Sequence, residues 1–270
     1  MEEIKIAENS NINFKQMIGA IIIIYFILIA WSNTYQIGCF SLIIPIFITL
    51  ILASSYIEIK LKQKECFRNC YFKENTIISK ILMSPYFTSI FFVLLSISYA
   101  VTLMYDILSF KMEFYFIIGI FTILIFKLYK YLLSFFSGIV NDKHLQIFAR
   151  EITTNISAFI LLCIYIVIYI NDYEPEYLKS TLGETLNFAS NSVSSKCSYI
   201  DFILKLKIEI EAYIWFYMKE FNVLDTNKNL KELAWIGFIV FNVLSILGLN
   251  RLIVQVVYLV NKIIKDEDGK

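Results

Sequence analysis

The chain has 270 residues, of which 58% are apolar and 17% charged, and its mean hydropathy is +0.66. Soluble domains contain about 45–50% apolar and about 25% charged residues, so these values exclude an ordinary soluble domain and a disordered chain. The chain has 24 Lys and Arg against 23 Asp and Glu, so it lacks the net positive charge that is typical of a nucleic-acid-binding protein. We therefore expect an all-α fold, namely a polytopic helical membrane protein.

Uncharged windows set the expected membrane spans. No charged side chain occurs in the 42 residues between Lys15 and Glu58. One helix of that length would reach about 63 Å, twice the ~30 Å hydrocarbon core, so the segment must fold back at its polar run 32–36. Four more windows follow along the chain. The expected spans are 17–33, 37–57, 81–105, 114–136, 152–171 and 233–250, and none of them contains Asp or Glu.

The distribution of basic residues sets the expected orientation. Six spans put both termini on one side, and that side holds 16 Lys and Arg, whereas the opposite short loops hold only Lys111. Basic residues in short segments stay in the cytoplasm, so both termini are expected to be cytoplasmic, in the plasma (inner) membrane. The acidic first residues predict a signal anchor rather than a cleaved signal peptide.

A basic segment, 58–80, is expected to be a cytoplasmic loop between the second and third spans. Two interpretations remain open for its basic side chains. They hold the helix ends against anionic lipid at the cytoplasmic face, or they dock a soluble cytoplasmic protein partner. The candidate docking residues are Lys60, Lys62, Lys64 and Arg68.

The segment 172–232 is expected to be external. Within it, residues 199–223 place apolar side chains on one stripe at helical spacing. The stripe consists of Ile203, Leu206, Ile210, Tyr213, Ile214, Tyr217 and Phe221. Apolar and polar residues also alternate over 204–211, which would suit a strand. We favour an amphipathic helix, lying on the outer leaflet or lining the mouth of an assembly, because the stripe persists beyond the alternation and is rich in aromatic residues.

Few residues are available for catalysis or metal binding. His144 is the sole histidine and lies in an expected cytoplasmic loop, and the chain has no HExxH, Walker A, GxGxxG or GxSxG motif. Cys66 and Cys70 are spaced CxxxC, but a zinc site needs two more ligands. Cys39 and Cys163 are expected to pack within spans, and Cys197 to have no partner in its own segment. We expect a non-enzymatic protein without metal or cofactor.

Basic and polar side chains near the membrane remain as candidate functional groups. Lys127 and Lys130 share a helix face near the cytoplasmic end of the fourth span, and Arg251 follows the sixth. They either reach the lipid headgroups or line a basic pore that favours anions. Asn242 and Ser245, three residues apart in the sixth span, are candidates for hydrogen bonds between helices.

These features favour an oligomeric channel or pore-type effector, or a membrane sensor, built from identical subunits and working with a cytoplasmic partner. Bacterial antiviral defence and stress modules often use small membrane proteins of this kind. The alternative is a permease subunit, because the layout resembles that of ABC-2-type transporters. The resemblance rests on six spans, cytoplasmic termini, a basic loop after the second span and a large external segment after the fifth. It implies an ATPase partner.

Overall fold

The computed structural model describes residues 2–71, 84–110, 112–170, 175–223 and 228–268. Within these ranges it also describes side chains, except at 2–12, 65–71, 109, 165–170, 218, 220–223, 228–241 and 265–268. The elements are α1 (Glu2–Thr34), η1 (Cys39–Leu42, a 3-10 helix), α2 (Ile43–Tyr71), α4 (Pro85–Ser109), α5 (Met112–Phe136), α6 (Asp142–Ile170), α7 (Leu182–Ser192), α8 (Ser198–Val223) and α9 (Lys228–Asp268). Since no strand occurs in these ranges, the all-α expectation is confirmed for the described chain.

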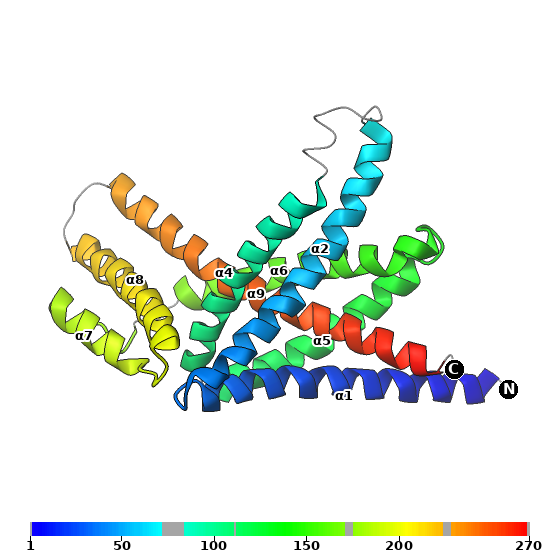
Figure 1. Cartoon of the computed structure of the whole chain (residues 1–270), viewed down its shortest axis with the longest axis horizontal. Helices are drawn as coiled ribbons and strands as arrows, with labels where there is room; N and C mark the ends of the chain where they lie inside the picture. Colours follow the sequence, from blue (N-terminus) through cyan, green and yellow to red (C-terminus); the bar gives the residue numbers. More distant parts are fainter. Residues whose placement is uncertain (1, 72–83, 111, 171–174, 224–227, 269–270) are drawn as a thin grey trace.

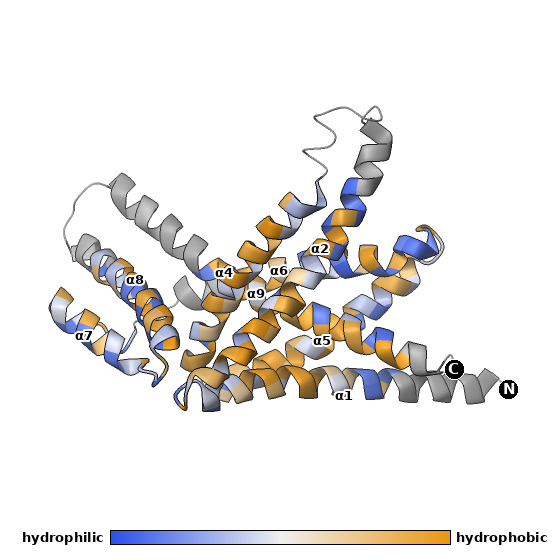
Figure 2. Cartoon of the chain, in the orientation of Figure 1, coloured by the Kyte–Doolittle hydropathy of each residue, from blue (hydrophilic) through white to orange (hydrophobic). Residues whose placement is uncertain are grey.

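Among the described residues, six helical segments are long and apolar enough to cross a membrane, which agrees with the expected number of spans. They are Asn13–Thr34, Cys39–Lys64, Pro85–Leu108, Met112–Phe136, Asp142–Ile164 and Asn242–Ile264. Figure 1 shows the two ends of the chain together at one end of the bundle, as an even number of spans requires. In Figure 2 the apolar colour covers long stretches of α1, α4 and α5, whereas α7 and α8 mix apolar with polar residues.

Several helices extend beyond the expected spans. The helix α6 begins at Asp142 rather than near 152, and the Asn141 side chain caps it by accepting a hydrogen bond from the Lys143 amide at 3.2 Å. The helix α9 covers the expected span 233–250 and continues through Arg251 to Asp268. The sequence windows stop at charged residues, but a helix need not stop there when the charge is buried against other helices.

The extended helices correct one further expectation and qualify another. The expected loop 58–80 is helical as far as Tyr71, where α2 ends, and residues 72–83 lie outside the described ranges. Carboxylates also occur within the apolar helices, because Glu58, Asp106 and Glu151 all fall inside the six segments that could cross a membrane. The expected spans themselves contain no Asp or Glu, but the longer apolar segments of the structure reach past their ends to these carboxylates.

The helix α9 is the centre of the bundle. Of its apolar segment, 67% is buried inside the protein, against 28–39% for the other five. It contacts α1, α2, α4, α5, α6 and α8. At Gly248 it passes very close to α4, since a β-carbon there would lie only 3.1 Å from the Tyr99 backbone oxygen. Small residues allow such close approach between membrane helices.

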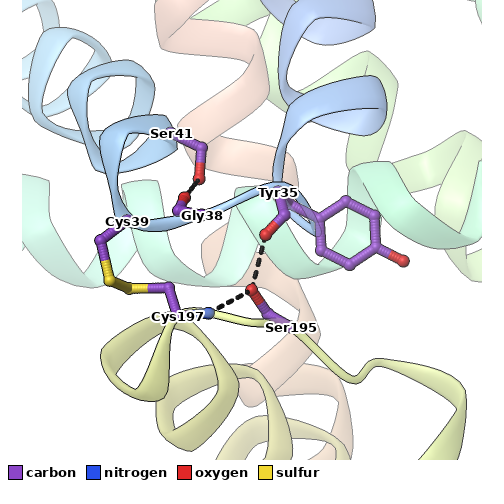
Figure 3. Close-up of a disulfide and its surroundings, with 6 residues drawn as sticks. All are labelled: Tyr35, Gly38, Cys39, Ser41, Ser195 and Cys197. Carbon is purple, nitrogen blue, oxygen red and sulfur yellow. Dashed lines mark hydrogen bonds between the residues drawn. A yellow bond between two sulfur atoms is a disulfide. The ribbon is translucent and has the colours of Figure 1, made fainter.

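The helices α7 and α8 pack together beside the end of the bundle opposite the termini (Figure 1). Thr181 caps α7, because its hydroxyl accepts a hydrogen bond from the Glu184 amide at 3.3 Å. The helix α8 covers residues 199–223, which confirms the helix expected there and excludes the alternative strand. A disulfide between Cys39 and Cys197 fastens the start of α8 to the turn between α1 and α2 (Figure 3).

The disulfide corrects the cysteine expectations. Cys39 does not pack as a free thiol inside a span, and Cys197 has a partner 158 residues away in the same chain. A hydrogen bond beside it, from the Ser195 hydroxyl to the Tyr35 backbone oxygen at 2.6 Å, joins the same two segments. Cys163 is a free, exposed cysteine on α6. The side chains of Cys66 and Cys70 lie outside the described ones.

Candidate functional site

Polar side chains are concentrated in the centre of the bundle, where α9 meets α6 and α2. We call this set the polar core. It comprises Asn242, Ser245, Asn250, Arg251, Gln255 and Asn261 of α9 with Arg150, Thr153, Thr154 and Ser157 of α6, all of them buried. Polar and ionisable groups in the interior of a membrane bundle are expensive to bury and commonly mark a functional site. The polar core is therefore the candidate site.

An ion pair between a buried guanidinium and a partly exposed carboxylate lies in the half of the polar core nearer the termini. The Arg150 guanidinium is fully buried and lies 2.8 Å from the Glu58 carboxylate on α2. It also donates a hydrogen bond to the Gln255 side chain at 3.0 Å and lies 4.3 Å from the centre of the Tyr258 ring. Arg150 thus joins α2, α6 and α9. The pair neutralises a charge that would otherwise be strongly destabilising in a membrane helix.

Arg251 lies near the middle of α9, in a different environment. Its guanidinium is 3.4 Å from the centre of the Tyr56 ring, and the residue is only 8% exposed. Its Nε and Nη2 atoms are buried and have no hydrogen-bond partner among the described residues. Because the apolar segment is Asn242–Ile264, Arg251 lies about 14 Å from one end and about 20 Å from the other. A cation with two unmet donors therefore lies near the middle of an apolar segment long enough to cross a membrane.

Neighbouring polar groups around Arg251 also have hydrogen-bonding capacity to spare. Asn250 donates to the Thr154 backbone oxygen at 2.9 Å, but its side-chain oxygen has no partner within the described part of the chain. The Nε atom of Arg150 also has no hydrogen-bond partner among the described residues. Buried polar atoms in native proteins are nearly always hydrogen-bonded, so several unmatched atoms in one region indicate a site that binds something polar.

Lys130 lies at the end of the bundle that holds the termini. Its ammonium donates to the Asn261 side chain at 2.6 Å and lies 5.5 Å from the centre of the Phe126 ring. It lines a surface cavity of about 410 Å³ between α5 and α6, with Leu133, Ser134, Ser137, Asp142, Leu145 and Gln146. The candidate basic residues are therefore not gathered at one level, because Asn261 is about 15 Å along α9 from Arg251. Lys127 is exposed on the outer surface of α5.

The remaining candidate residues lie inside the bundle or along α2. Asn242 and Ser245 are each 3% exposed and lie inside the bundle. In the basic segment, the Lys60 ammonium is 3.5 Å from the Glu151 carboxylate and Lys64 donates to the Thr88 hydroxyl at 2.6 Å. Lys62 is partly exposed, and the Arg68 side chain lies outside the described ones. Lys60 and Lys64 are thus held against α6 and α4 rather than projecting from a loop.

A second charged cluster lies where α8 meets α4. The Lys207 ammonium is 3.0 Å from the Asp106 carboxylate, 2.8 Å from the Glu211 carboxylate and 3.9 Å from the centre of the Tyr105 ring. Burial raises the pKa of the Glu211 carboxyl, Lys207 opposes this shift and Asp106 adds to it. Burial alone would lower the pKa of the Lys207 ammonium, but Asp106 and Glu211 together raise it above its usual value. Two carboxylates share one lysine here.

Metal binding receives no support from the described side chains, among which no group of three or more His, Cys, Asp or Glu could hold an ion. His144 lies in the first turn of α6 and is exposed. Sequence reasoning missed the ion pair of Arg150 with Glu58 and most of the uncharged residues of the polar core, namely Asn250, Gln255, Asn261, Thr153, Thr154 and Ser157. The signal for Arg150 was the apolar run Ile147–Phe148–Ala149 before it, which extends the helical pattern past the charge.

Comparison with protein families, with curated proteins and with solved structures finds no match to this chain. Its function has to be argued from the polar core.

Proposed function

We propose that the chain is a non-enzymatic membrane protein whose six-helix bundle conducts small anions through the polar core, with Arg251 as the binding point in the middle of the membrane. A single observation carries the proposal. The Arg251 guanidinium is buried near mid-span with two nitrogen atoms that no described residue satisfies. A guanidinium presents planar N–H donors suited to anions, so a passing anion would satisfy both the charge and the donors.

The energetics favour a ligand over a purely structural role for Arg251. An unsatisfied buried donor costs about 1–3 kcal/mol, and more when the group is charged. The Tyr56 ring offsets part of this, since cation–π contacts contribute about 0.5–2 kcal/mol. Arg150, by contrast, has a counter-charge in the Glu58 carboxylate at 2.8 Å. Arg251 is thus the group in the polar core that gains most from an anion.

Basic groups continue from Arg251 toward the end that holds the termini. Arg150 lies beside Gln255, one turn further along α9, and Lys130 lies beside Asn261. Positive side chains along a path favour anions over cations, as they do in anion-selective pores. The path in this proposal runs through each subunit, rather than between subunits as a ring of Lys127, Lys130 and Arg251 would require.

Ion flux into vesicles tests the proposal. Purified protein is reconstituted into liposomes that contain a halide-quenched dye, and iodide entry is followed with potassium and valinomycin present. We expect Arg251→Gln to reduce iodide entry at least about tenfold, the effect of losing about 1.4 kcal/mol of stabilisation at the narrowest point. Lys127→Gln, at an exposed position on α5, is the matched control and should leave the rate unchanged. Equal rates for the wild type and a well-folded Arg251→Gln variant would refute the role of Arg251.

We further propose that the termini are cytoplasmic, in the plasma (inner) membrane. The Cys39–Cys197 disulfide supports this, because it lies at the end opposite the termini and disulfides persist on the oxidising side of a membrane. The distribution of basic residues along the sequence supports the same orientation, because the short loops expected on the opposite side hold only Lys111. A membrane-impermeant maleimide should label a cysteine placed at exposed Lys196 in intact cells, but not one placed at exposed Lys143.

Assembly and partners complete the proposal. We infer a homo-oligomer that works with a cytoplasmic protein, as channel-type effectors and sensors of bacterial defence modules do. The ABC-2-type permease is the alternative, favoured by the shared side of the termini and by the α7–α8 segment between the fifth and sixth spans. The mass of the purified particle separates them, since a closed ring supports the channel and copurification of two ATPase subunits supports the permease.

A further inference from the structure

The helix α8 has two apolar faces, and the bundle covers only one of them. The covered face consists of Ile200, Leu204, Lys207, Ile208, Glu211, Ala212 and Trp215, all buried. The apolar side chains on the other face are each at least 36% exposed, and they are Tyr199, Phe202, Ile203, Leu206, Ile210, Tyr213 and Tyr217. We call this second set the α8 stripe. Five of the seven residues of the stripe expected from the sequence belong to the α8 stripe, whereas Ile214 is partly buried and the Phe221 side chain lies outside the described ones.

Single exposed apolar side chains are ordinary on a protein surface, but the seven of the α8 stripe form one continuous row. Their spacing of three and four residues places them on a single side of the helix over about 27 Å. A contiguous apolar surface of this kind marks a contact with a membrane or another protein. A narrow polar edge flanks the stripe, where Asp201 and Lys205 form an ion pair at 2.8 Å.

We propose that the α8 stripe lies against the lipid leaflet on the α7–α8 side of the membrane. The disulfide sets the depth of the helix, because Cys39 is the first residue of the second apolar segment, Cys39–Lys64, and Cys197 immediately precedes α8. The start of α8 is thus fastened at the level where the spans end. Ser195 reinforces this position through its bond to the Tyr35 backbone oxygen (Figure 3).

The composition of the stripe also suits lipid. Tyr199, Tyr213 and Tyr217 combine an apolar ring with a polar hydroxyl, the combination that is enriched where hydrocarbon meets headgroups. The aliphatic residues Leu206 and Ile210 lie between them along the helix and would face the acyl chains. Interfacial helices have this arrangement of an apolar face and a charged edge.

A second copy of the chain is a poorer occupant, on the ground of area. A stripe about 27 Å long and about 10 Å wide offers roughly 300 Å² on each partner. Two such stripes would bury roughly 600 Å² in total, below the ~1,200 Å² at the lower end of stable protein–protein interfaces. Lipid requires no minimum area, since contact with acyl chains stabilises each buried side chain separately.

The proposal is independent of the anion path, because the α8 stripe contains no residue of the polar core. It is tested with nitroxide labels at single cysteines replacing Phe202, Leu206 or Ile210. Cys66, Cys70 and Cys163 are changed to Ser, and the Cys39–Cys197 disulfide is kept. Each labelled protein is placed in vesicles of phosphatidylethanolamine and phosphatidylglycerol. Collision rates are then measured with dissolved oxygen, which partitions into lipid, and with nickel ethylenediaminediacetate, which stays in water.

Lipid contact requires a several-fold higher ratio of oxygen to nickel collisions at the three stripe positions than at Lys205→Cys. That control lies on the polar edge beside Leu206, and losing its partly exposed ion pair costs only about 0–1 kcal/mol. Equal, water-like ratios at all four positions would overturn the proposal. Spin–spin broadening at the stripe that disappears on dilution with unlabelled protein would also overturn it, in favour of a second copy.

Discussion

The Cys39–Cys197 disulfide is, among the described residues, the one side-chain covalent bond between the six-helix bundle and the α7–α8 pair. The α-carbons of the two cysteines are 4.8 Å apart although 158 residues separate them in the sequence. The link closes a loop that contains four of the six candidate spans, from the second to the fifth. It therefore restrains the unfolded chain as well as the position of α8.

We expect the Cys39→Ser, Cys197→Ser double variant to be less stable than the wild type. Closing long loops lowers the entropy of the unfolded chain, and disulfides of this kind contribute about 2–4 kcal/mol. Thermal unfolding in detergent should show a lower Tm for the double variant, and the wild type should shift to the same value after reduction. Cys163→Ser, which removes a free and exposed thiol, is the control and should have no effect. An unchanged Tm after verified reduction would contradict the prediction.

The Arg150–Glu58 pair predicts an asymmetric response to substitution. Arg150 is fully buried, whereas the Glu58 side chain is 34% exposed, so Glu58→Gln leaves a buried charge without a counter-charge. Removing one partner of a buried pair costs about 3–5 kcal/mol, and replacing both with apolar residues is often neutral. We expect Glu58→Gln to be strongly destabilising and Glu58→Leu with Arg150→Met to recover most of the loss.

The free energy of unfolding in mixed detergent and SDS measures both variants. The control is the Lys60–Glu151 pair in the same region, which is 3.5 Å apart and partly exposed, so that Lys60→Gln should cost only about 0–1 kcal/mol. Similar losses from Glu58→Gln and Lys60→Gln would mean that the buried pair has no special importance.

Local patterns in the sequence predicted the number of spans and the helix over 199–223, because hydropathy windows and helical spacing depend only on neighbouring residues. The same patterns began the fifth span too late, after Arg150, and ended the sixth span too early, before Arg251. Charged side chains usually end an apolar helix at the membrane surface, but these two are buried against Glu58 and the Tyr56 ring. Partners on distant helices determine that outcome, and sequence spacing does not contain them.

The disulfide and the orientation of α8 also required the structure. Pairing among five cysteines cannot be deduced from their spacing, and Cys39 lies in an apolar stretch that favours a span. For α8, the sequence identified an apolar stripe but not which side faces the bundle. The buried side contains Lys207 and Glu211, which pair with each other at 2.8 Å, and Lys207 also pairs with Asp106 on α4 at 3.0 Å, a contact that helical spacing does not reveal.

The Lys207 cluster predicts how stability depends on pH. The pKa of Glu211 is raised above its usual value of 4.5, so the folded protein retains a proton there that the unfolded chain has lost. Stability conferred by protonated Glu211 is therefore present at low pH and decreases as pH rises from about 4.5 through the folded-state value. The charges that face Glu211 are Lys207 on α8 and Asp106 on α4, with Tyr177 beside it. The contribution of Lys207, whose pKa is also raised, persists below pH 10.5 and is lost only above it.

Glu211→Gln should consequently flatten the decrease in Tm above pH 4.5. Glu176→Gln, at an exposed position, should follow the wild-type curve, and a Glu211→Gln variant with the full wild-type slope would show that another group titrates.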